Sequence, residues 1–158
     1  MDGRRFLHQL GFAEQIVVWA ARNWLTGGGR WHKVEQECAA VFGMARGATI
    51  CQALDSFLWV LNTSACRQVG LGRLCCDRVW PDELRLITIL SHCQGAAESE
   101  AVAQLSDLLP PTAARVAVDF AGAVAEILQT SGYRLPDAPA AEPLAQDTNL
   151  HFVSMAVH

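Results

Sequence analysis

Hydrophobic residues recur every three or four positions along most of the chain, which is the period of one face of an α-helix. The first such stretch covers residues 4–25. Its apolar positions with this spacing are Phe6, Leu10, Ala13, Val17, Ala20, Ala21 and Trp24. Three consecutive glycines, Gly27 to Gly29, follow, and glycine loses more backbone entropy on folding than any other residue. We therefore predict a first helix over residues 4–25 that ends at a glycine corner.

The same period predicts further helices. They cover residues 31–44, 48–63, 81–94, 98–109 and 111–131. The helix over residues 81–94 has the clearest start, because Pro81 suits the first helical position and two acidic residues follow it. Gly47 is expected to precede the third helix. Residues 66–80 break the helical period. We predict an all-α bundle of five or six helices over residues 4–135, with a short irregular or extended element near residues 66–80.

The composition changes after residue 135, where three prolines and several alanines indicate an extended linker. The last ten residues are apolar again and include Leu150, Phe152, Val153, Met155 and Val157. Ordering a backbone costs about 1–2 kcal/mol per residue, so burial of these side chains does not suffice to hold the segment. We treat residues 136–158 as a linker with an apolar C-terminal segment. We expect the segment to dock as a strand on a sheet edge or as a helical turn in a groove.

Composition and charge exclude several classes of protein. The chain has 158 residues, of which 51% are hydrophobic and 18% charged, which suits a packed core and not a disordered chain. The net charge is -4 and the arginines are scattered, so we do not expect nucleic-acid binding. The apolar runs are far shorter than the roughly 20 residues that span a bilayer, and no cleavable signal pattern follows the N-terminal arginines. We expect no membrane association and a cytoplasmic location. A single lysine among many alanines and glycines suggests a GC-rich bacterial genome.

The chain has six cysteines, at positions 38, 51, 66, 75, 76 and 93. Their spacing is irregular and the expected core is large enough without disulfides, so we expect reduced thiols. Cys38, Cys51 and Cys93 lie on the apolar faces of predicted helices, where a free cysteine behaves as a small hydrophobic residue.

The cysteines near the middle of the chain offer a candidate metal site. Cys75, Cys76 and His92 are the residue types that zinc prefers, and Cys66 with Cys75 and Cys93 is a second grouping. Neither grouping has the C-x2-4-C spacing of common zinc sites. Cys75 with His92 is also a candidate nucleophilic pair, because such partners need only meet in the fold.

The tryptophans indicate a different kind of site. Trp24 and Trp31 flank the glycine corner, where full burial of a large side chain is difficult, and tryptophan is enriched at protein interfaces. We predict that they bind a partner, together with Leu150, Phe152 and Met155 of the C-terminal segment. The partner is another protein or a second copy of the chain.

Two classes of function follow from these observations. The first is a non-enzymatic interaction or regulatory module that acts through an apolar surface and its C-terminal segment. The alternative is a small-molecule or metal-binding protein, with or without catalytic activity, that uses the Cys/His region over residues 66–93. The sequence lacks a G-x-S-x-G motif, a phosphate-binding P-loop and a dinucleotide-binding glycine set. This favours the first class, and we expect no cofactor.

Overall fold

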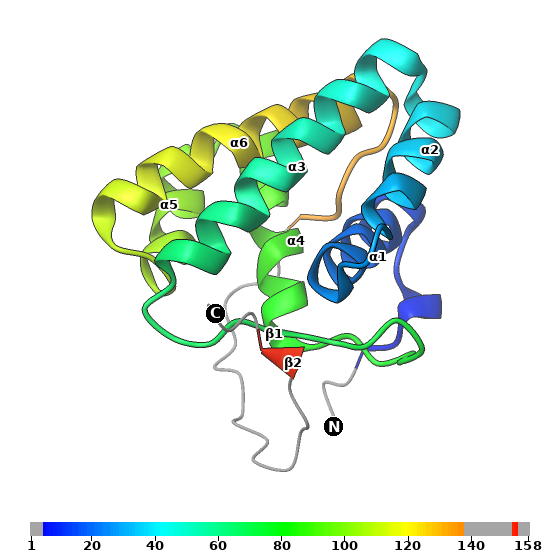
Figure 1. The fold of residues 1–158 in the computed structure, drawn as a ribbon. Helices are drawn as coiled ribbons and strands as arrows, with labels where there is room; N and C mark the ends of the chain where they lie inside the picture. Colours follow the sequence, from blue (N-terminus) through cyan, green and yellow to red (C-terminus); the bar gives the residue numbers. More distant parts are fainter. Residues whose placement is uncertain (1–4, 138–152, 155–158) are drawn as a thin grey trace.

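The computed structural model describes residues 5–137 and 153–154, and it confirms the all-α fold (Figure 1). Its six α-helices are α1 (Phe12–Thr26), α2 (Trp31–Phe42), α3 (Met44–Ser64), α4 (Pro81–Gln94), α5 (Glu98–Ser106) and α6 (Pro111–Thr130). A 3₁₀ turn, Leu7–Gln9, precedes α1, and two short strands are present, β1 (Gly70–Leu71) and β2 (Val153–Ser154). Among the described residues, no helix is both long and apolar enough to cross a membrane.

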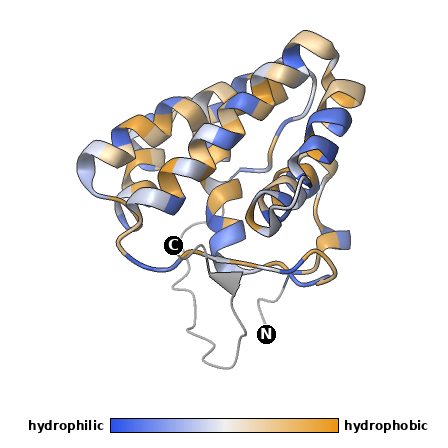
Figure 2. Cartoon of the chain, in the orientation of Figure 1, coloured by the Kyte–Doolittle hydropathy of each residue, from blue (hydrophilic) through white to orange (hydrophobic). Residues whose placement is uncertain are grey.

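The main core forms where α3 and α4 pack against α6, and α5 packs against both α4 and α6. Figure 2 shows apolar and polar residues alternating around the helices, as expected of helices that bury one face. Leu61, Leu105 and Leu128 are fully inaccessible to solvent. The helix α2 packs mainly on α3, so the pair forms a helical hairpin at one side of the bundle.

The residues at the start of α4 begin the helix where the sequence predicts it. Pro81 takes the first helical position, and the Glu83 carboxylate accepts a hydrogen bond from the Trp80 backbone N–H at 2.9 Å. This contact satisfies one of the N–H groups that have no partner within a helix. Pro111 likewise takes the first helical position of α6, where no side chain caps the helix.

The predicted start of the first helix is wrong. The helix α1 begins at Phe12, because the Gly11 N–H donates to the Glu14 carboxylate at 2.9 Å and caps the helix there. The residues before it pair with the loop ahead of α4 instead. The Leu7 N–H donates to the carbonyl oxygen of Asp77 at 2.7 Å, and the N–H of Val79 donates to that of Arg5 at 2.9 Å.

The expected role of Gly47 is also wrong, since this residue lies inside α3. The corner between α2 and α3 is Gly43, which has a φ of 87°. A Cβ atom at Gly47 would lie 2.7 Å from the carbonyl oxygen of Cys38 and 2.8 Å from the Cα of Ala39. The glycine is therefore required where the backbones of α2 and α3 meet.

The extended element expected near residues 66–80 is β1. Gly70 pairs with Ser154 and Leu71 with Val153 in an antiparallel arrangement. Val153 and Ser154 are the two described residues of the C-terminal segment, and they form a strand. A strand is one of the two structures expected for this segment. Leu150, Phe152 and Met155 lie outside the described residues, as does most of the linker.

Candidate functional site

A hollow of about 380 Å³ lies on the outer side of the α2–α3 hairpin. We call it the α2–α3 groove, and its lining residues are Trp31, Glu35, Ala39, Met44, Gly47, Ala48, Cys51, Gln52 and Asp55. The positions on α3 are three or four residues apart, so they share one face of that helix. Gly47 is one of the lining residues, and its lack of a side chain lets the α2 backbone at Cys38 and Ala39 approach α3 closely.

Exposed apolar side chains lie at both ends of this face of α3, Met44 within the hollow and Trp59 beyond it. Met44 is 81% exposed at the start of the helix, and Trp59 is 59% exposed one turn after Asp55. The Trp59 ring meets the edge of the Trp24 ring, with centroids 6.4 Å apart. The Trp24 indole N–H donates to the Asp55 carboxylate at 2.7 Å. These contacts fix two aromatic rings and a carboxylate at one end of the groove.

The groove carries negative charge. Glu35 and Asp55 contribute carboxylates, and both residues are exposed. None of the described residues that line the groove is a lysine or an arginine. An apolar ligand with a basic group would match both the exposed rings and the carboxylates.

Two thiols lie under the groove. Cys38 of α2 is 1% exposed and Cys51 of α3 is 4% exposed. A hydrogen bond from Cys51 lowers the pKa of the Cys38 thiol. The same hydrogen bond, and then burial, raise the pKa of Cys51.

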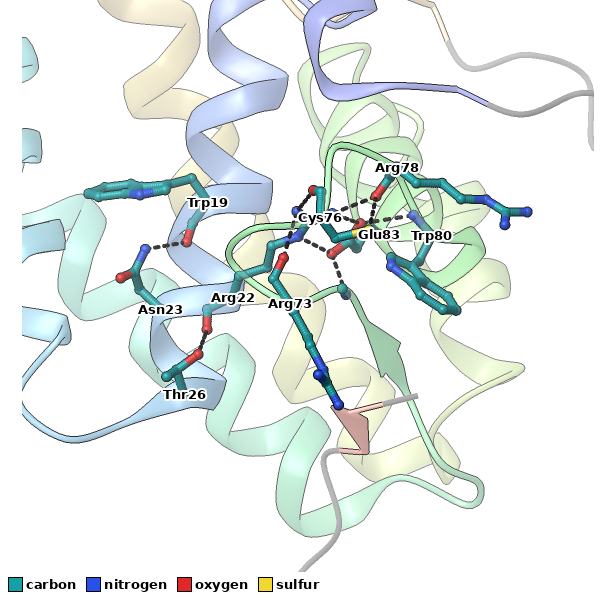
Figure 3. A network of polar contacts seen from close by, with 10 residues as sticks. Trp19, Arg22, Asn23, Thr26, Arg73, Cys76, Arg78, Trp80 and Glu83 are labelled. Atoms are coloured by element: carbon teal, nitrogen blue, oxygen red, sulfur yellow. Dashed lines mark hydrogen bonds and ion pairs between the residues drawn. The ribbon is translucent and has the colours of Figure 1, made fainter. Parts of the chain in front are cut away.

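A second polar cluster lies between α1 and the N-terminus of α4 (Figure 3). Arg22 and Glu83 form a buried two-pronged ion pair, with nitrogen–oxygen distances of 2.7 and 2.9 Å. The Arg22 guanidinium also donates to the main-chain carbonyl oxygens of Arg73, Cys76 and Arg78. One arginine thus holds both α4 and the loop that precedes it.

The acidic residues of α4 complete this cluster. Glu83 accepts from the Gly72 N–H at 2.8 Å, and Asp82 accepts from the Gly70 N–H at 2.7 Å. Asp82 also binds Arg67 through both oxygens, and this contact raises the pKa of Arg67. Because its donors and acceptors are used internally, we assign the cluster to support of β1 and not to binding of a substrate.

The structure does not bring together the residues considered as metal ligands. Cys75 and Cys76 lie in the loop before α4, whereas His92 is in its last turn. His92 is eleven positions after Pro81 in α4, which is about 16 Å along the axis. Among the described residues, no three His, Cys, Asp or Glu side chains gather to hold a metal ion. The same separation applies to Cys75 and His92 as a nucleophilic pair.

Two of the residues predicted to bind a partner, Trp24 and Trp31, lie at the α2–α3 groove. Trp31 lines the groove and Trp24 contacts Asp55 at its end, so the fold brings both to one surface. Sequence reasoning missed Trp59, although it lies four residues after Asp55 and so falls on the same helix face. It also missed the Arg22–Glu83 pair, whose members are 61 positions apart.

Comparisons with models of protein families, with curated proteins and with solved structures found no match.

Proposed function

We propose that the protein is a non-enzymatic interaction module whose α2–α3 groove binds an amphipathic helical segment of a partner protein. The observation that supports this best is the exposed face of α3, where Met44 and Trp59 stand at the two ends of an acid-lined hollow. Tryptophan dominates binding energies at interfaces, and methionine adapts to varied apolar partners.

The length of this face suits a helix. Met44 and Trp59 are fifteen residues apart on α3, which corresponds to about 22 Å along its axis. A helix of about four turns laid in the groove would place apolar side chains against both residues. Basic side chains on the same helix would meet Glu35 and Asp55, so we expect the segment to carry lysine or arginine between its apolar anchors.

The C-terminal segment contributes in a second way. The pairing of β2 with β1 supports docking of this segment on its own domain, because β1 offers backbone hydrogen bonds that apolar burial alone does not supply. In this arrangement Val153 and Ser154 pair with the edge of β1. A second copy of the chain is the alternative occupant of the groove, and a dimer that becomes a monomer on Met44→Ala substitution would identify it, whereas a dimer that this substitution leaves intact forms through another face.

The experiment uses a synthetic helical peptide of leucine and lysine, and a second peptide in which glutamate replaces lysine. Tryptophan fluorescence reports binding, because three of the five tryptophans lie at the groove. We expect the lysine peptide to bind the full chain and to bind Met44→Ala more weakly. Val116→Ala is the matched control, since Val116 is an exposed apolar residue on α6. Equal binding of both peptides, or equal binding by all three proteins, would contradict the proposal.

A further inference from the structure

Three of the five tryptophans gather around Asp55 at one end of the α2–α3 groove. Trp31 lines the hollow together with Asp55. The Trp24 indole N–H donates to Oδ1 of Asp55 at 2.7 Å, and the rings of Trp24 and Trp59 meet at an angle of 66°. We call these four residues the tryptophan cluster. They come from α1, α2 and α3, so the fold and not the local sequence assembles them.

The packing of α2 on α3 explains why Trp31 lies at this end of the groove. The Cys51 sulfur is 3.8 Å from the carbonyl oxygen of Val34, so these two residues are level with each other in the helical hairpin. Asp55 is one turn further along α3, and Trp31 is about one turn back along α2. The two residues are therefore level as well, on opposite sides of the groove.

The carboxylate of the cluster has one oxygen to spare. Oδ1 of Asp55 accepts the hydrogen bond from Trp24, and no described residue donates to Oδ2 or forms an ion pair with Asp55. Glu35, the other carboxylate of the groove, lies 3.5 Å from the ring Nδ1 of His32. Asp55 is thus the carboxylate that is available to a ligand, and it is exposed to solvent.

The tryptophan rings beside Asp55 are also accessible. Trp59 is exposed, and Trp24 and Trp31 are half-buried. The face of a tryptophan ring attracts a cation, and aromatic groups of this kind recognise quaternary ammonium ions in other proteins. The neighbouring carboxylate adds a full negative charge to that attraction.

We propose that the tryptophan cluster binds a quaternary ammonium group, which is the chemistry shared by choline and by the side chain of a trimethylated lysine. The methyl groups would contact the rings, and the positive charge would lie beside Asp55. An unmodified lysine suits the site less well, because its compact ammonium group is strongly hydrated. This inference does not rest on the proposed binding of a helical segment, since a small cation alone would occupy the site.

The arrangement disfavours other charged ligands. An anion would meet the carboxylate of Asp55. A divalent metal ion such as Ca²⁺ takes six to eight oxygen ligands, and no three His, Cys, Asp or Glu side chains gather in the part of the chain that the structure describes.

The test titrates the full chain by calorimetry with choline and with its neutral isostere, in which a tert-butyl group replaces trimethylammonium. We expect choline to bind about tenfold more tightly than the isostere. Asp55→Asn removes the charge and keeps an oxygen that accepts from Trp24, so it should weaken choline about tenfold and leave the isostere unchanged. Trp31→Leu should weaken choline similarly by removing one ring. Val116→Ala is the control and should bind both compounds as wild type does.

A second titration identifies the source of the cation. The leucine and lysine peptide is compared with the same peptide carrying one trimethylated lysine. Tighter binding of the trimethylated peptide supports a modified partner protein as the source, whereas equal binding of the peptides together with preferential binding of choline supports a free small molecule. The inference is overturned if wild type prefers neither choline to its isostere nor the trimethylated peptide to the unmodified one, or if Asp55→Asn and Trp31→Leu keep full affinity for choline. In that case binding of the unmodified peptide would still support the proposed function, while binding of choline without either peptide would support the cation site alone.

Discussion

Replacing Glu83 with glutamine tests whether the buried ion pair with Arg22 holds the loop ahead of α4. The substitution keeps the size of the side chain and removes its charge. Each carboxylate oxygen of Glu83 accepts two hydrogen bonds. One oxygen accepts from Arg22 and from the Gly72 N–H, and the other from Arg22 and from the Trp80 N–H. All four partners are donors, so an amide nitrogen in either position would face two donors.

The expected cost follows from the burial of both groups. The side chains of Arg22 and Glu83 are 1% and 0% exposed, so water does not replace the lost partner. Removing one member of a buried ion pair costs about 3–5 kcal/mol, because the other charge remains buried without compensation. A domain of this size has a total stability of about 5–15 kcal/mol, so the variant loses a large part of it.

Urea unfolding followed by circular dichroism measures this loss. Glu126→Gln is the matched control, because Glu126 is exposed on α6 and should change the free energy of unfolding by less than about 0.5 kcal/mol. A double variant, Arg22→Met with Glu83→Leu, should not recover stability relative to Glu83→Gln, since it leaves three main-chain carbonyl oxygens and two main-chain N–H groups without the partners that Arg22 and Glu83 provide. A loss below about 1 kcal/mol for Glu83→Gln would refute the structural role assigned to the pair.

Four further predictions concern other parts of the chain. Gly47→Ala should lower stability by about 1–3 kcal/mol because the new Cβ meets the α2 backbone, whereas Gly122→Ala, with open space around it, should raise stability by about 0.5–1 kcal/mol in urea unfolding. Deleting residues 148–158 should lower the melting temperature or abolish association, since it removes the strand paired with β1, and an unchanged melting curve and elution volume would show that the segment contributes nothing. Light scattering of the full chain at micromolar concentration should give roughly twice 17.2 kDa, because symmetric dimers are the commonest way to cover an exposed apolar face, and a monomer at all concentrations would contradict this. Burial raises the pKa of Cys93 to about 11, above its unfolded value of about 8.5, so the free energy of unfolding should be independent of this thiol's ionisation at lower pH and should fall as pH rises from about 8.5 to 11. Urea unfolding of wild type and Cys93→Ala at several pH values measures this, and an equal pH dependence of both proteins would show that the thiol is not desolvated.

The sequence predicts best those features that neighbouring residues determine. The boundaries of α4 follow from Pro81, from the acidic residues after it and from the apolar period, and the structure has them at the expected positions. The start of α1 could not be predicted in this way. Its preceding residues pair with Asp77 and Val79, and these contacts join distant parts of the chain.

The candidate site shows the same division. Trp24 and Trp31 flank a glycine corner in the sequence, and in the structure both lie at the α2–α3 groove or its end. The close approach of α2 and α3 at Gly47 could not be predicted, because a glycine in a helical pattern indicates a break as readily as a helix crossing. Cys75 and His92 are near in sequence, yet the length of α4 separates them.

The affinity of Trp59→Ala for a partner protein tests the central claim, that the α2–α3 groove is a protein-binding surface. The partner is the protein that co-purifies with the full chain from its native host, and calorimetric titration gives its Kd for wild type, Trp59→Ala and Val116→Ala. Truncation of a tryptophan that anchors an interface costs about 2 kcal/mol or more, so Kd should rise about 30-fold for Trp59→Ala and stay within about twofold for Val116→Ala. Equal affinities of all three proteins would contradict the account, because the partner would then bind elsewhere on the molecule.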